Sequence, residues 1–126
     1  IKAGQVALIE AAVNASTTGK GAAGEIAITA TAKNPDSDTA ALTVDNSQIT
    51  ATTSNSGNAG NLSLTANSGD IAIQSNSTVS TTTSGAGNSG SVAIASQNLK
   101  VKDGSVVQAR SLGTGAPGDI EVDVPN

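Results

Sequence analysis

The chain has 126 residues, of which 37% are hydrophobic, and it contains no Phe, Trp, Tyr, Met or Cys. A wide globular core needs large side chains, so this composition predicts a narrow interior packed with Val, Ile, Leu and Ala. The lack of cysteine excludes disulfides and thiolate chemistry. The formal net charge is −4, and the few basic residues are scattered without aromatic neighbours, so nucleic acid is not expected as a partner.

Short alternating segments, typical of β-strands, recur along the chain in groups of three. The groups lie within 6–28, 42–64, 71–94 and 99–122. Each group is interpreted as one coil of three brief strands, so we expect a single domain over 1–126 with about four coils. The stretch 33–39 interrupts the repeat with Pro and Asp residues and is expected to be an inserted, exposed loop.

Part of every coil follows one eighteen-residue pattern without gaps. Glycines stand eight and eleven positions after its start, at Gly21, Gly24, Gly57, Gly60, Gly87, Gly90, Gly115 and Gly118. Apolar residues stand at its start and thirteen and fifteen positions later, at Val13, Ile49, Val79, Val107, Ile26, Leu62, Val92, Ile120, Ile28, Leu64, Ile94 and Val122. Agreement at five offsets in four copies is hard to obtain by chance, so a stack of equivalent coils is predicted.

Alternation within the strands assigns side chains to the inside or the outside. In the first shared strand Val13 and its equivalents point inward, while Thr50, Ser80 and Gln108 point outward. Coils stacked about 4.8 Å apart would join the apolar positions into continuous core ladders. We therefore predict an all-β fold, a parallel β-solenoid. Disorder is the alternative for a chain rich in Gly, Ser, Thr and Asn, and the regular strand spacing argues against it.

Three glycine segments match the dinucleotide-binding spacing G-x-G-x-x-G, at 19–24, 85–90 and 113–118. That fingerprint needs a helix N-terminus to receive a pyrophosphate, whereas here an alternating apolar strand follows directly. We therefore interpret the glycines as structural residues that allow a positive φ where the chain turns a corner. No cofactor is expected.

Acidic residues give one weak candidate for a metal site. Asp36, Asp38 and Asp45 form a candidate Ca²⁺ site, because carboxylates are ligands for hard cations, although their spacing matches no EF-hand loop. Repeated Ca²⁺ sites of the β-roll type are not expected, since the position after the last glycine of the pattern is acidic in only two of four copies, Glu25 and Asp119.

The chain is poorly supplied for catalysis, because it has no His, Cys or Tyr. Asp119, Glu121 and Asp123 alternate on one outward face, and Arg110 lies in the same coil. This arrangement keeps a polysaccharide-cleaving β-helix enzyme as an alternative. A solvated terminal face is the preferred interpretation, so no enzyme activity is expected.

The segments 49–66 and 79–96 resemble repeats of large filamentous-haemagglutinin-like exoproteins, particularly cyanobacterial ones. The similarity extends over essentially the whole chain. Members of that family are right-handed parallel β-helices exported by two-partner secretion. The resemblance therefore implies a right-handed parallel β-helix that is displayed at the cell surface and takes part in adhesion or fibre formation.

These observations together lead us to expect an extracellular or cell-surface structural β-solenoid, a fibre subunit or a segment of a large exoprotein. Outward hydroxyls such as Thr50, Thr52, Thr82 and Ser80 leave an ice- or carbohydrate-binding module as the alternative, with surface polysaccharide as a partner. No apolar run is long enough to span a membrane, so membrane insertion is not expected. Because solenoid ends expose unpaired backbone groups, we expect flanking repeats or a second copy, docked head-to-tail, to cover them.

Overall fold

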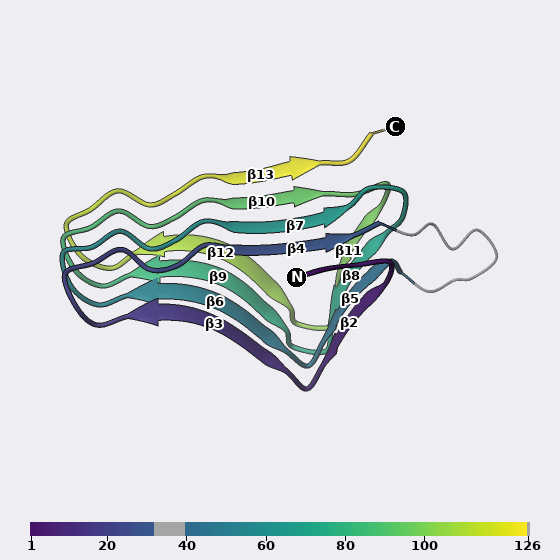
Figure 1. Ribbon diagram of the computed structural model, residues 1–126, viewed down its shortest axis with the longest axis horizontal. Coiled ribbons are helices and arrows are strands. Elements are labelled where there is room, and N and C mark those ends of the chain that lie inside the picture. Colours follow the sequence, from purple (N-terminus) through teal and green to yellow (C-terminus); the bar gives the residue numbers. More distant parts are fainter. Residues whose placement is uncertain (32–39, 126) are drawn as a thin grey trace.

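Figure 1 shows the computed structural model, which describes residues 1–31 and 40–125. The described residues form thirteen β-strands and no helix. The strands are β1 (Lys2–Ala3), β2 (Val6–Ile9), β3 (Ala12–Thr17), β4 (Ile26–Ala30), β5 (Leu42–Asp45), β6 (Gln48–Thr53), β7 (Leu62–Ala66), β8 (Ile71–Gln74), β9 (Thr78–Thr83), β10 (Val92–Ala95), β11 (Leu99–Val101), β12 (Val106–Ser111) and β13 (Ile120–Asp123).

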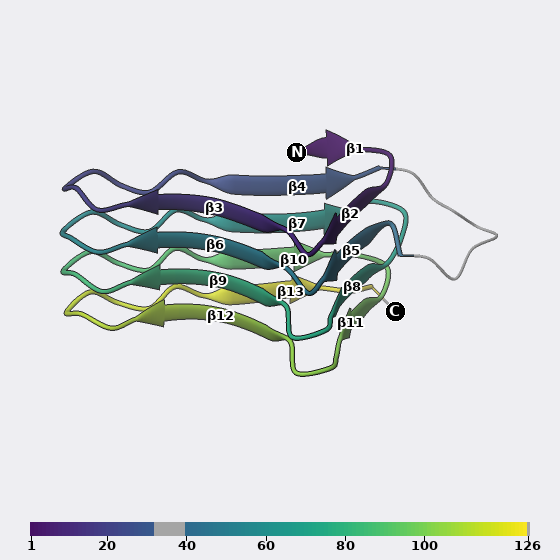
Figure 2. The same cartoon turned by 90° about the horizontal axis from the view of Figure 1, so that it is seen from below.

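The strands form three parallel sheets, and each sheet takes one strand from every coil. Sheet A has the order β1-β4-β7-β10-β13, sheet B has β11-β8-β5-β2, and sheet C has β12-β9-β6-β3. The chain runs from sheet B to sheet C to sheet A in each coil, and the coils wind with a right-handed sense along one axis (Figure 2). The predicted parallel β-helix of about four coils is therefore confirmed.

The pairing between coils follows the sequence repeat. In sheet C the starts of the shared pattern pair in the series Val13, Ile49, Val79 and Val107. In sheet A the positions thirteen residues later pair in the series Ile26, Leu62, Val92 and Ile120. Each ladder therefore stacks side chains of one kind, so every added coil buries the apolar edge of the coil before it.

The interior is a narrow column of apolar side chains between the three sheets. Residues of the second coil (β5 to β7) and third coil (β8 to β10) have no exposed surface at Leu42, Ile49, Leu62, Leu64, Ile71 and Ile73. Each of these two coils has a neighbouring coil on both sides, and the two neighbours cover its core residues. Burial in this fold therefore comes from stacking rather than from any single coil.

The two ends of the stack are unlike each other. In the last coil (β11 to β13), the ladder residues Ile120 and Val122 are 47% and 49% exposed, although the equivalent residues of the third coil are buried. In the first coil (β2 to β4), Ile28 is fully buried where β1 pairs with β4. The last coil thus presents a bare apolar edge, whereas a short extra strand covers part of the first.

The loop expected at 33–39 lies outside the described residues. On either side of it the repeat continues without a shift, because β4 pairs with β7 and β5 pairs with β2 in the register of the pattern. The insertion therefore leaves the stacking of the first two coils unchanged.

Candidate functional surfaces

The corner between sheets C and A is built from glycines that lie directly against the preceding coil. A Cβ atom added to Gly57 would lie 2.0 Å from the carbonyl oxygen of Gly21, and one added to Gly87 would lie 2.0 Å from that of Gly57. The same contact would occur at 2.0 to 2.1 Å for Gly60, Gly90, Gly115 and Gly118. No side chain fits at such distances, so the stacking itself requires glycine at these positions.

The expectation that these glycines adopt a positive φ is wrong. Among the glycines of the described residues, Gly104 alone has a positive φ, of 75°, and it lies at another corner, between sheets B and C. The physical reason for glycine is the close approach of stacked backbones. A repeating glycine in a sequence has the same appearance whether a turn or a neighbouring backbone requires it.

The glycine segments also run directly into strands β4, β10 and β13, as the interpretation against nucleotide binding predicts. Asparagine side chains between the glycines form hydrogen bonds to the next coil. The Asn58 Oδ1 accepts a hydrogen bond from the backbone N–H of Asn88 at 2.8 Å. The Asn88 Oδ1 in turn accepts one from the backbone N–H of Ala116 at 2.9 Å. This corner therefore joins coils through side chains as well as through the sheets.

Positive φ angles cluster at the corner between sheets B and C. Asn46 and Asn76 have φ angles of 45° and 58° there, and a serine follows each of them. The Ser47 hydroxyl accepts a hydrogen bond from the Ala11 amide at 2.9 Å, and the Ser77 hydroxyl accepts one from the Ser47 amide at 3.1 Å. Sequence reasoning missed this serine ladder, although the recurring Asn-Ser before a sheet C strand was a usable signal.

One coil carries a buried polar pair inside the column. Thr81 is fully buried, and its hydroxyl lies 3.0 Å from that of Ser89, which also donates a hydrogen bond to the Thr81 carbonyl oxygen at 3.2 Å. In the second coil the corresponding residues are Ala51 and Ala59. The two hydroxyls satisfy each other, which lets the third coil hold polar groups where its neighbour holds methyl groups.

The outer face of sheet C carries a row of hydroxyl groups. The hydroxyls of Ser16 and Thr52 lie 2.6 Å apart, and those of Ser80 and Thr82 lie 3.0 Å apart. Thr50 and Thr82 are partly exposed, whereas Ser80, which was expected to face solvent, is only 3% exposed. The hydroxyls therefore bind one another, and this face is less open than strand alternation alone predicts.

Asp45 is the described member of the candidate Ca²⁺ group, since Asp36 and Asp38 lie outside the described residues. Its carboxylate accepts a hydrogen bond from the Gln74 side-chain amide at 2.9 Å. Hydrogen bonds from the Ser75 and Gln74 side chains hold the pKa of Asp45 below its ordinary value. In the part of the chain that the structure describes, no three His, Cys, Asp or Glu residues are grouped to hold a metal ion. Asp45 therefore acts here as a link between β5 and β8.

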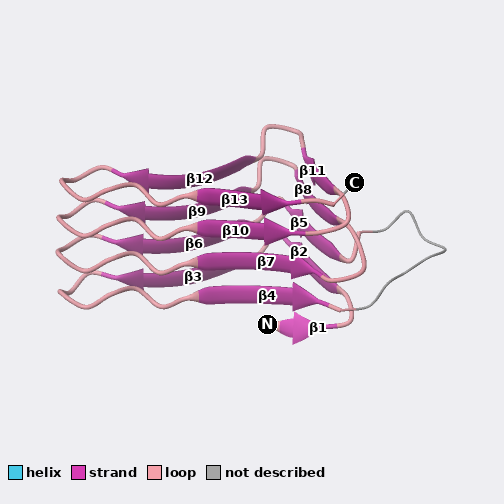
Figure 3. Cartoon of the chain, turned by 90° about the horizontal axis from the view of Figure 1, so that it is seen from above, coloured by secondary structure: helices cyan, strands magenta, loops and turns pink. Residues whose placement is uncertain are grey.

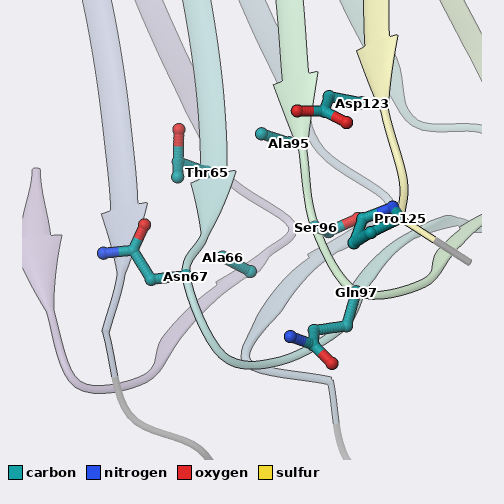
Figure 4. Close-up of a pocket in the computed structure, with 8 residues that line it drawn as sticks. All are labelled: Thr65, Ala66, Asn67, Ala95, Ser96, Gln97, Asp123 and Pro125. Carbon is teal, nitrogen blue, oxygen red and sulfur yellow. The ribbon is translucent and has the colours of Figure 1, made fainter.

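The acidic residues of the last coil face solvent. Asp119, Glu121 and Asp123 are all exposed, and Arg110 lies on β12 of sheet C rather than beside them on sheet A. Asp123 lines a shallow hollow of about 180 Å³ whose other lining residues are uncharged; Thr65 and Ser96 are among them (Figure 4). A neighbouring hollow of about 170 Å³ is lined by Asp123 together with Glu121, so two of the three candidate carboxylates lie on one hollow of this face.

Comparisons with protein-family models, curated proteins and solved structures found no match. In the described ranges no helix is long and apolar enough to cross a membrane. The resemblance to filamentous-haemagglutinin-like repeats thus stays a prediction from sequence.

Proposed function

We propose that the chain is an extracellular structural or adhesive β-solenoid, either a fibre subunit or a segment of a large surface exoprotein. The observation that carries the proposal is that side chains as well as sheets join one coil to the next. Asparagines form such bonds at the glycine corner, and serines form them at the corner between sheets B and C. Side chains that bond one coil to the next stabilise the stack, and such a stack can extend coil by coil. They therefore support a structural role for the chain.

The resemblance of 49–66 and 79–96 to filamentous-haemagglutinin-like repeats supports the surface location and the adhesive role. The outer faces support the same role in chemical terms. Thr, Ser, Asn and Gln side chains cover much of these faces, and such groups can form many weak hydrogen bonds with a hydrated target. An elongated stack would present those groups repeatedly along its length.

Location is the test of this proposal. Intact producing cells are treated with a membrane-impermeant amine reagent, for which the exposed Lys20, Lys100 and Lys102 are targets. We expect labelled chain on intact cells or unlabelled chain in the medium, while a cytosolic marker protein stays unlabelled in the cells. A chain that is found only in the cytosol and is labelled only after lysis would refute the proposal.

A carbohydrate- or ice-binding module is the second candidate, and the bonded hydroxyl row on sheet C favours it. A binding site there would involve Thr52, whose hydroxyl is held by Ser16. Thr52→Lys should then abolish retention on immobilised polysaccharide or thermal hysteresis, whereas Thr43→Lys on the outer side of sheet B should not. If the unmodified chain gives neither retention nor hysteresis at high concentration, this candidate is excluded.

A further inference from the structure

A hollow of about 290 Å³ lies on the outer face of sheet B, across β5, β8 and β11. Figure 3 shows these three strands side by side. Ala72 lies within the hollow and pairs with Thr43 of β5 and Lys100 of β11, while Asp70 and Gln74 lie two residues away on either side of it. Paired residues and residues two apart share one face of a sheet. The hollow therefore arises because four larger side chains surround one methyl group.

Two polar side chains of the hollow are held in place by neighbouring coils. The side-chain amide of Asn98 donates a hydrogen bond to the Asp70 carboxylate at 2.8 Å, and that of Gln74 donates one to the Asp45 carboxylate at 2.9 Å. A carboxylate has about four acceptor positions, and the carbonyl oxygen of an amide group accepts independently of its nitrogen. The Asp70 carboxylate and the Gln74 carbonyl oxygen are therefore positioned acceptors for the hydroxyl groups of a ligand.

The hollow has a positive balance of charge, although the net charge of the chain is −4. Two of the six basic residues, Lys100 and Lys102, line it together with one acidic residue, Asp70. Both lysines are exposed. Part of the Lys102 charge acts on the Asp45 carboxylate. Lys100 is therefore the main cation that the hollow offers to an anionic ligand.

Negative and positive groups lie toward opposite ends of the hollow. Asp70 directly precedes β8, whereas Lys102 comes one position after the last pair of β11 with β8 and so lies beside Gln74. Four residues of extended chain separate Asp70 from Gln74, which is roughly 13 Å. A single carboxylate or phosphate ion is too small to reach both ends, and an acidic peptide would bring further carboxylates against Asp70. The arrangement fits a longer ligand with an anionic group at one end and hydroxyl groups along the rest.

We propose that this hollow binds a short stretch of an acidic polysaccharide that contains uronic acid. The uronate carboxylate lies against Lys100 and Lys102, which donate charge-assisted hydrogen bonds to it, and sugar hydroxyl groups donate to Gln74 and Asp70. This inference rests on the adhesive role proposed above, and it names the class of target and the contact. The contact is separate from the hydroxyl row of the second candidate function, because that row lies on sheet C.

Biolayer interferometry on immobilised polygalacturonate tests the contact. The methyl ester of the same polymer is the ligand control, because it keeps the hydroxyl groups and removes the charge. We expect the chain to bind the polyuronate and not the ester. Lys100→Gln should weaken binding about ten-fold or more, because a charge-assisted hydrogen bond is lost. Lys20→Gln removes the same charge at an exposed residue of the glycine corner, so it is the matched control and should bind like the unmodified chain.

Ala72→Leu separates a shaped site from a general attraction between charges. The substitution fills the hollow on the outer face of β8 and leaves every charge in place. We expect it to weaken binding as strongly as Lys100→Gln does, while the midpoint of urea unfolding stays close to that of the unmodified chain.

Several results would overturn the proposal. Absence of binding to polygalacturonate at high chain concentration would exclude this ligand class, and equal binding of the ester would indicate a neutral carbohydrate instead. Equal losses for Lys100→Gln and Lys20→Gln, or unchanged binding by a folded Ala72→Leu chain, would show that binding does not run through the hollow. Equally tight binding of polyglutamate would assign the hollow to an acidic peptide. The labelling of intact cells decides the adhesive role independently, so the two proposals can fail separately.

Discussion

Gly87→Ala should destabilise the fold although it adds only one methyl group. The new Cβ would lie 2.0 Å from the Gly57 oxygen and 2.5 Å from the Gly57 carbonyl carbon, so the two corners must move apart by about 1 Å or more. Two hydrogen bonds lie beside these corners. The backbone N–H of Asn88 donates to Asn58 Oδ1 at 2.8 Å, and the backbone N–H of Ala59 donates to the Asn88 carbonyl oxygen at 2.9 Å. Such a movement breaks both, and with the strain of overpacking the loss amounts to about 2 to 4 kcal/mol.

Equilibrium urea unfolding followed by far-ultraviolet circular dichroism measures this effect, since the chain has no aromatic residue for fluorescence. The measurement is made at concentrations where the chain is monomeric, with midpoints compared rather than extrapolated free energies, because repeat arrays can depart from two-state behaviour. Gly21→Ala is the matched control, because it is the same change at the equivalent corner of the first coil, where the new Cβ has no atom within 4 Å. Equal midpoints for Gly87→Ala and Gly21→Ala would refute the close-approach argument.

Three further experiments test the interior and the coil-to-coil links. Ile94→Asp should prevent folding, because a carboxylate in a 2% exposed position costs about 4 kcal/mol or more, whereas Thr82→Asp on the outer face should be tolerated; equal damage in urea unfolding would show that the two faces are wrongly assigned. Asp45 has a lowered pKa, so its contribution to stability is present above its ordinary pKa and is lost as the pH falls toward the lowered value; the difference in midpoint between Asp45→Asn and the unmodified chain should therefore shrink on acidification. In a double-mutant cycle, Thr81→Ala and Ser89→Ala should show a coupling of about 0.5 to 1.5 kcal/mol, and strictly additive losses would contradict their mutual hydrogen bond.

The sequence predicts the architecture well because, in a stacked fold, residues at the same position of the repeat pair with each other in neighbouring coils. Positions such as Ile49 and Val79 recur at one offset of the pattern, and the structure pairs them directly. Inward alternation predicts burial in the middle coils for the same reason. It does not predict the half exposure of Ile120, because exposure at an end depends on the neighbouring coil rather than on the strand that carries the residue.

The corners were less predictable, because their chemistry depends on contacts between coils. The repeating glycines predict a turn with positive φ, whereas the positive φ angles lie at the corner between sheets B and C, at residues such as Asn46 and Asn76. The burial of Ser80 has a similar origin. Its position alternates outward, but the neighbouring Thr82 hydroxyl and the adjacent strands cover it. The strands that flank Ser80 are paired with it through Thr50 and Gln108, about thirty positions away, and strand periodicity carries no information about how closely they cover it.

The corners also explain how so repetitive a chain keeps one register. Apolar alternation alone would tolerate a slip of two residues, since inward positions would still meet inward positions. At the glycine corner such a slip is excluded in both directions. Moving the third coil by two residues one way places Ser89 where only Gly87 fits, and moving it the other way places Asn88 where only Gly90 fits. The three-residue spacing of Gly87 and Gly90 thus excludes the two-residue slips that the ladders of similar side chains would tolerate.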